Sequence, residues 1–95
     1  MRAIISVIGK DTVGILAAVS AKCADYNINV IEVTQSVLQD MFVMVMLTDI
    51  SNINGDFSNF VDEMTSLGNE KNLSIRAMHE DIFNAMHTIW GDTIC

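Results

Sequence analysis

The sequence predicts an α+β domain in which two helices cover one face of a four-stranded antiparallel sheet. Three observations carry this prediction: apolar runs typical of strands, two segments with helical spacing of apolar residues, and the order in which they alternate. The expected order is strand, helix, strand, strand, helix, strand, which is the split βαβ arrangement. Right-handed crossovers then place both helices on the same face of the sheet.

The first half of the chain predicts a strand, a helix and a second strand. Residues 2–8 are a run of isoleucine and valine with one serine, typical of a strand that is buried on at least one face. The helical stripe that follows is Ile15, Leu16, Val19 and Cys23, and Ala17, Ala18, Ala21 and Ala24 make this helix slim. We expect the helix to end near Tyr26–Asn27, because asparagine is accepted at a helix C-terminus. Residues 30–38 are predicted to be the second strand.

The second half predicts two further strands around a second helix. Residues 41–47 are apolar on both faces, as in a central strand, and follow an expected tight turn at Gln39–Asp40. Residues 48–55 are expected to be a polar loop. The next helical stripe is Phe57, Phe60, Val61, Met64 and Leu67, with Gly68–Asn69 as its expected end. The last strand is predicted as an edge strand, since Leu73, Ile75 and Ala77 alternate with Ser74, Arg76 and Met78.

The most apolar strands, the first and the third, should be central, which predicts a ferredoxin-like sheet with strand order 4-1-3-2. A single helix layer leaves the other sheet face uncovered. We expect Met44 or Met46 to point to that face as part of a contact surface, and the second strand has no proline to block its edge. Dimerisation is therefore expected. Residues 1–80 are expected to form the domain, and residues 81–95 a short C-terminal helix with a frayed end.

The composition argues against several classes of function. The 95 residues carry a net charge of −7, and the five cations, Arg2, Lys10, Lys22, Lys71 and Arg76, are scattered. Scattered cations argue against binding to nucleic acid or to anionic membranes. No apolar run reaches the roughly 18 residues that a membrane span needs. The start of the chain also lacks the pattern of a secretory signal, so a cytoplasmic location is expected.

The loop between the first strand and the first helix is the candidate binding site. Its sequence is Gly9-Lys10-Asp11-Thr12-Val13-Gly14-Ile15-Leu16. Backbone N–H groups of residues 13–16 open the helix, where a carboxylate meets both donors and the positive end of the helix dipole. Asp11 can accept from an α-ammonium group, and Asn29 offers both a donor and an acceptor. Such a set suits a zwitterionic amino acid.

Each of these residues also has a purely structural interpretation. Asp11 or Thr12 can cap the helix, Gly14 can permit close packing, and Asn29 can tie the start of a strand. Gly9 can simply allow a tight turn after the strand. Lys10 fits a solvated loop charge better than a ligand clamp. The residues by themselves favour capping over ligand contact.

The loop, the element order and the segment Asn27-Ile28-Asn29-Val30 together resemble the ACT domain family of small regulatory modules, over roughly residues 1–80. The chain is similar to stand-alone, single-domain ACT proteins and to the domains of the glycine cleavage system repressor. Many family members carry proline at the position of Val13. The resemblance implies an amino acid bound between two copies, with residues 9–16 and Asn29 as ligand-binding residues.

Metal and catalytic chemistry find less support. The side chains with metal-ligand chemistry are His79, Glu80, Asp81 and His87, and their spacing matches no standard site. The seven methionines fit core packing better than a soft ligand site. Cys23 fits a core thiol, and no nucleophile elbow, phosphate-binding GxxxxGK[ST] motif or HExxH motif is present. We therefore expect no cofactor, no metal and no enzymatic activity.

The working hypothesis is a homodimeric regulatory module that binds a small polar metabolite, most simply an amino acid, where the first loop of one subunit meets its partner. A separate effector protein would recognise the liganded dimer, since no output domain is evident in the chain. The alternative is a ligand-free protein–protein interaction module that acts through the sheet face and the tail.

Overall fold

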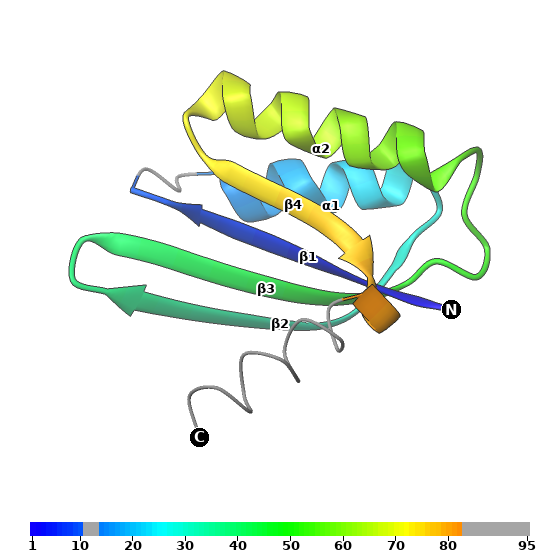
Figure 1. The fold of residues 1–95 in the computed structure, drawn as a ribbon, viewed down its shortest axis with the longest axis horizontal. Helices are drawn as coiled ribbons and strands as arrows, with labels where there is room; N and C mark the ends of the chain where they lie inside the picture. The colour runs from blue at the N-terminus through cyan, green and yellow to red at the C-terminus, as the bar shows by residue number, and fades with distance from the viewer. Residues whose placement is uncertain (11–13, 83–95) are drawn as a thin grey trace.

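The computed structural model describes residues 1–10 and 14–82, and its elements follow the predicted order (Figure 1). The strands are β1 (Arg2–Gly9), β2 (Asn29–Leu38), β3 (Met41–Asp49) and β4 (Ser74–His79), in one antiparallel sheet of order β2-β3-β1-β4. Helices α1 (Ile15–Asp25) and α2 (Phe57–Lys71) cover the same face of this sheet. The predicted ferredoxin-like topology is confirmed, with β1 and β3 central. A helical turn follows β4 at residues 80–82, and the rest of the predicted tail helix lies outside the described residues.

The core is built on the pairing of β1 with β3. The row that faces the helices consists of Ala3, Ile5 and Val7 opposite Thr48, Met46 and Met44, all fully buried. The helices add Ile15, Val19 and Cys23 from α1 and Phe60, Met64 and Leu67 from α2. The Thr48 hydroxyl donates to the Ala3 carbonyl over 2.9 Å, so this buried polar group has a partner.

The expectation that Met44 or Met46 points to the open face was wrong. Both side chains are fully buried on the helix side, opposite Val7 and Ile5. Residues 41–47 are apolar at every position, so their sequence does not reveal which alternate set faces inward; the register with β1 decides it. The apolar residues of the central strands on the open face are instead Ile4, Ile8, Met41, Val43, Val45 and Leu47.

Both helices end in a Schellman motif with an asparagine in the left-handed region. At the end of α1, Asn27 has φ +56° and the Ile28 N–H donates to the Cys23 carbonyl over 2.8 Å. At the end of α2, Asn72 has φ +58° and the Leu73 N–H donates to the Gly68 carbonyl over 2.8 Å. The predicted end of α1 is confirmed.

The predicted end of α2 at Gly68–Asn69 was wrong, because the helix continues to Lys71. Gly68 is buried inside the helix, and a Cβ at that position would lie 2.7 Å from the Leu73 carbonyl oxygen. The glycine therefore serves close approach of α2 to the chain that enters β4, and it does not stop the helix.

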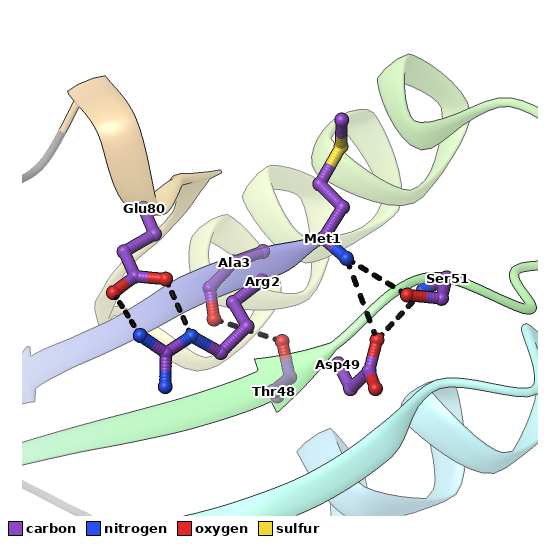
Figure 2. Close-up of polar contacts among 7 residues, drawn as sticks. All are labelled: Met1, Arg2, Ala3, Thr48, Asp49, Ser51 and Glu80. Atoms are coloured by element: carbon purple, nitrogen blue, oxygen red, sulfur yellow. Dashed lines mark hydrogen bonds and ion pairs between the residues drawn. The ribbon is translucent and has the colours of Figure 1, made fainter.

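Polar contacts close the end of the sheet where β1 begins (Figure 2). The α-ammonium group of Met1 donates to Ser51 Oγ over 2.8 Å, and the Arg2 guanidinium pairs with the Glu80 carboxylate. Hydrogen bonds from the side chain and backbone of Ser51 lower the pKa of Asp49. Asp49 was expected in a loop together with Thr48, but both continue β3 because they pair with β1.

A small cluster that begins at the core residue Phe60 joins the two helices. The Tyr26 and Phe60 rings meet edge to face with centroids 5.3 Å apart. The Tyr26 hydroxyl donates to the Glu63 carboxylate, which raises the pKa of Tyr26 and lowers the pKa of Glu63. Lys22 Nζ lies 3.6 Å from Glu63 Oε1 and favours the same charged form.

We expect Gly68→Ala to lower the free energy of unfolding by about 1–3 kcal/mol, because the added methyl group meets backbone that cannot move aside without shifting β4. Helix propensity alone would predict the opposite sign, a gain of up to about 1 kcal/mol. Urea denaturation followed by circular dichroism measures the difference. Ser66→Ala, at an exposed position of the same helix, is the control and should stay within about 0.5 kcal/mol of wild type. A Gly68→Ala protein as stable as wild type would contradict this account.

We expect Glu63→Gln to flatten the acid limb of the stability profile. The folded-state pKa of Glu63 is lowered, so its contribution is present above the ordinary value of 4.5 and is lost as the pH falls through the folded value. Urea denaturation at pH 7 and at about pH 3.5 should show a smaller loss for Glu63→Gln than for wild type. Glu70→Gln, also on α2, is the matched control. An unchanged profile in Glu63→Gln would show that the cluster does not couple to protonation.

Candidate functional site

The first loop lies at the end of the sheet where β1 stops, between the β2–β3 turn and the start of β4. Gly9 is opposite Phe42 in the sheet register, and Lys10 Nζ lies 3.4 Å from the Asp40 carboxylate in the turn. Both charges of this ion pair are about three-quarters exposed, so the pair contributes little to stability. Lys10 nevertheless has an ion-pair partner within its own chain, the Asp40 carboxylate.

The start of α1 is fixed by Ile15, whose side chain is 2% exposed in the core. Gly14 occupies the N-cap position, and its carbonyl accepts the first helical hydrogen bond from the Ala18 N–H over 3.0 Å. The N–H groups of Ile15, Leu16 and Ala17 precede that first donor, so they have no acceptor within the helix. Leu16 is 40% exposed and Ala17 is exposed, whereas Ile15 is buried, so the first turn of α1 is partly at the surface.

Gly14 has a different role from the close packing expected of it. Its φ is +75°, in the left-handed region, and a Cβ at this position would meet no described atom within 4 Å. Glycine is therefore needed for the backbone conformation that turns the chain into α1. Asp11, Thr12 and Val13 lie outside the described residues. The N-cap position is Gly14, so neither Asp11 nor Thr12 is the N-cap residue considered in the sequence analysis.

Gly9 serves packing more than turning. A Cβ there would collide with the Leu73 side chain, which crosses Gly9 as β4 begins. Leu73 is 7% exposed and belongs to the core. The contact therefore holds the end of β1, and with it the start of the loop, against the segment that joins α2 to β4.

The structure does not bring Asn29 to the loop within one chain. Asn29 pairs with Asp49, and Asp49 pairs with Arg2, at the opposite end of the sheet from Gly9. Seven residues of β1 separate the two ends, which corresponds to about 23 Å. Asn29 is exposed at its position. A ligand of amino-acid size cannot contact both groups of the same subunit.

The other residues considered for chemistry have structural partners. Cys23 is 1% exposed, and burial raises the pKa of its thiol to about 11, which keeps it protonated at neutral pH. His79 lies against Phe57 with ring centroids 4.5 Å apart, and Glu80 is paired with Arg2. Within residues 1–10 and 14–82, no three side chains of the metal-ligating types come together. His87 lies outside these ranges.

Two hollows lie in the described part of the chain, the first at the end of the sheet opposite the loop and the second near the loop only at Leu73. One, of about 590 Å³, is lined by Met1, Arg2 and residues 79–82. The other, of about 460 Å³, runs between α2 and the outer edge of β4 and includes Arg76 among its lining residues. The sequence pattern had marked the last strand as an edge, but it held no signal for the groove, which depends on how α2 lies over that edge.

None of the helices in residues 1–10 and 14–82 is both long and apolar enough to cross a membrane.

Comparison with known proteins identifies the family of the chain. A family model for the ACT domain matches residues 2–78. The chain is 46% identical over 89 residues to UPF0237 protein lin0537 of Listeria innocua, which covers 94% of this chain and 100% of that protein.

Two solved structures share the fold. An ACT domain protein from Streptococcus pneumoniae has a TM-score of 0.75 and 36% identity, over 87% of this chain and 93% of that chain. A candidate glycine cleavage system transcriptional repressor has a TM-score of 0.62 and 22% identity, over 80% of this chain and 43% of that chain, which shows a shared fold alone. ACT domains are regulatory modules that typically bind small molecules and commonly form dimers. The element order, the sheet topology and these matches together show that the chain belongs to the ACT domain family.

Proposed function

We propose that this chain is a homodimeric regulatory module that binds a small zwitterionic metabolite, most simply an amino acid, at its first loop. The observation that carries the proposal is the partly exposed start of α1, where three consecutive N–H groups follow Gly14 and lack acceptors within the helix. A carboxylate at this point gains hydrogen bonds and the favourable end of the helix dipole. Asp11, beside these donors in the sequence, supplies an acceptor for the ammonium group.

A second copy of the chain completes the site in this proposal. Asn29 lies at the far end of the sheet from the loop of its own subunit, so it joins the site only from a partner. The free edge of β2 offers a route for that partner. β2 is the longest strand, stands at one end of the sheet order, and exposes Ile31, Val37 and Leu38 by 48%, 67% and 64%.

Antiparallel pairing of two β2 strands around a two-fold axis would bring such a partner to this edge. With the axis near Val33 and Thr34, Asn29 of one copy comes opposite Leu38 of the other, at the end of the sheet that carries the first loop. The β2 edge has no proline or lysine, although its register against β3 shifts between Val30 and Glu32, and its exposed apolar side chains would be covered. The interface is isologous, so two equivalent sites form in each dimer.

Regulation follows if the ligand stabilises one dimer geometry over another. A ligand that bridges two subunits makes different contacts in different dimer geometries, so it binds these geometries with different affinities. That difference in affinity shifts the equilibrium between the dimer geometries. A separate effector protein that recognises one geometry then responds to the metabolite concentration.

We expect one or a few of the twenty common amino acids to bind and to stabilise the protein. At about 100 times its Kd a ligand adds about 2.7 kcal/mol to the free energy of unfolding, which appears as a rise of several degrees in Tm. Titration of ¹⁵N-labelled protein should move the amide signals of Gly14, Ile15 and Leu16 before those of Asn59 and Asn69, which lie on α2.

An amino acid that raises Tm without moving the loop amides would contradict the location of the site. If no amino acid changes Tm or the spectrum while the protein remains dimeric, the ligand-free interaction module becomes the better description.

We expect subunit complementation between Gly14→Val and Asn29→Ala. Valine is strained at φ +75° and should distort the start of α1, while alanine at position 29 removes the amide of the partner, so each homodimer should lose binding. After the two variants are mixed and allowed to exchange subunits, the heterodimers should hold one intact site each, or about a quarter of all sites.

Calorimetric titration with an amino acid that binds wild type measures the recovery. Asn59→Ala, at an exposed position on α2, is the control and should bind like wild type. A mixture that recovers no binding, from variants that are both folded and dimeric, would show that the site lies within one chain or does not use Asn29.

A further inference from the structure

The outer edge of β4 forms a groove with α2. β4 is the last strand of the sheet, so within the described ranges its outward N–H and C=O groups face no neighbouring strand. The groove, of about 460 Å³, is lined on the helix side by Val61, Thr65 and Asn69, which follow one another at intervals of one turn. The strand side is formed by residues 73–78. An extended chain placed here would have backbone partners on one side and a helix above it.

The edge is regular and unblocked. β4 pairs with β1 without a bulge, from Ser74 opposite Ile8 to His79 opposite Ala3. It contains no proline or lysine, two residues by which edge strands commonly avoid pairing, and its charged side chain is Arg76. Its six residues are enough for an added strand of usual length. Strand addition to such an edge is a common way in which domains bind peptides.

Arg76 gives this edge a charge preference. It is exposed in the middle of β4, on the open face of the sheet opposite Ser6. Arg2, Lys10 and Lys22 are each held in an ion pair, whereas no carboxylate of the described part of the chain lies within 4.0 Å of the Arg76 guanidinium. Within residues 1–10 and 14–82, the Arg76 guanidinium therefore has no carboxylate partner, and a carboxylate of another protein can pair with it.

The same charge argues against a second copy as the occupant. Two β4 strands paired antiparallel about their centres would place Arg76 opposite or diagonal to its own equivalent. Like charges at such positions destabilise strand pairing. The edge therefore disfavours pairing with itself and favours an acidic strand.

We propose that the β4 edge binds an extended acidic segment of a partner protein by strand addition. A glutamate or aspartate of that segment lies beside Arg76 on the open face, and small apolar side chains at the alternate positions face Val61 and Thr65. This surface gives the effector of the proposed function a place to dock and rests on that function for its regulatory role. The pairing itself requires no amino acid.

Fluorescence anisotropy of the full chain with labelled synthetic peptides tests the proposal. The probe is the peptide Thr-Val-Glu-Val-Glu-Val-Thr, and its match carries lysine in place of both glutamates. Wild type should bind the glutamate peptide at least about tenfold more tightly than the lysine peptide. Arg76→Glu should reverse that order, and Lys71→Glu, which changes a cation at the end of α2, should preserve the wild-type order.

Two further peptides, N-methylated at one or the other set of alternate residues, test the backbone pairing. N-methylation of alternate residues removes the N–H donors from one edge of the extended peptide without changing its charge. The version methylated on the edge that pairs with β4 should lose binding, and the version methylated on the opposite edge should keep it. No binding of the glutamate peptide at millimolar protein, equal binding of both charge types, no reversal in folded Arg76→Glu, or equal binding of both methylated versions would each overturn the proposal. If an amino acid moves the loop amide signals but the peptides do not bind, the β4 proposal is wrong and the proposed function stands. If the peptides bind but no amino acid does, the β4 proposal stands and the metabolite site is wrong.

Discussion

The pairing of β1 with β3 is the constraint on which the rest of the molecule depends. It sets Ala3, Ile5 and Val7 against Thr48, Met46 and Met44 in a single buried row beneath both helices. A shift of one residue would turn every one of these side chains to the other face. The Thr48 hydroxyl bonded to the Ala3 carbonyl fits only the observed register, because the alternative would bury charged Asp49 in its place.

That register also decides where the functional groups lie. β1 runs from the polar cluster around Arg2, Asp49 and Ser51 to the first loop at Gly9, so the two ends of the sheet differ in chemistry. One end presents the start of α1, and the other presents Asn29. In the function proposed here, this separation would make a single subunit a half-site for an amino acid, and a second copy would complete it.

The two sheet edges differ in ways that suit different neighbours. The β2 edge is long and exposes apolar side chains, whose burial against a second copy is favourable without any charge match. The β4 edge is short, lies beside the α2 groove and carries Arg76, so self-pairing there brings like charges together. If the two proposals hold, the sheet would bind its own copy at one edge and a different protein at the other, and a change at one contact could reach the other through the sheet.

Much of the fold could be predicted because periodicity reports local structure directly. The alternation of residues 73–78 predicted an edge strand, and the stripe from Phe57 to Leu67 predicted a helix on the sheet. Gly68 was misjudged, because a glycine near a helix end has the same sequence appearance whether it stops the helix or admits a neighbouring backbone. The tertiary structure distinguishes the two, because a Cβ added at Gly68 would lie 2.7 Å from the Leu73 carbonyl oxygen.

The candidate site also has one part that the sequence predicted and another that it did not. The sequence identified the loop as a helix start with two glycines, and this is a local property. It did not identify the left-handed φ of Gly14, the distance between Asn29 and the loop, or the groove beside Arg76. By itself, then, the sequence determined the elements, their order and the central place of β1 and β3, since these depend on hydrophobic spacing along the chain. The tertiary structure alone decided which face Met44 and Met46 occupy and which polar groups share an end of the sheet, because strand register is set by contacts between residues 33 to 47 positions apart.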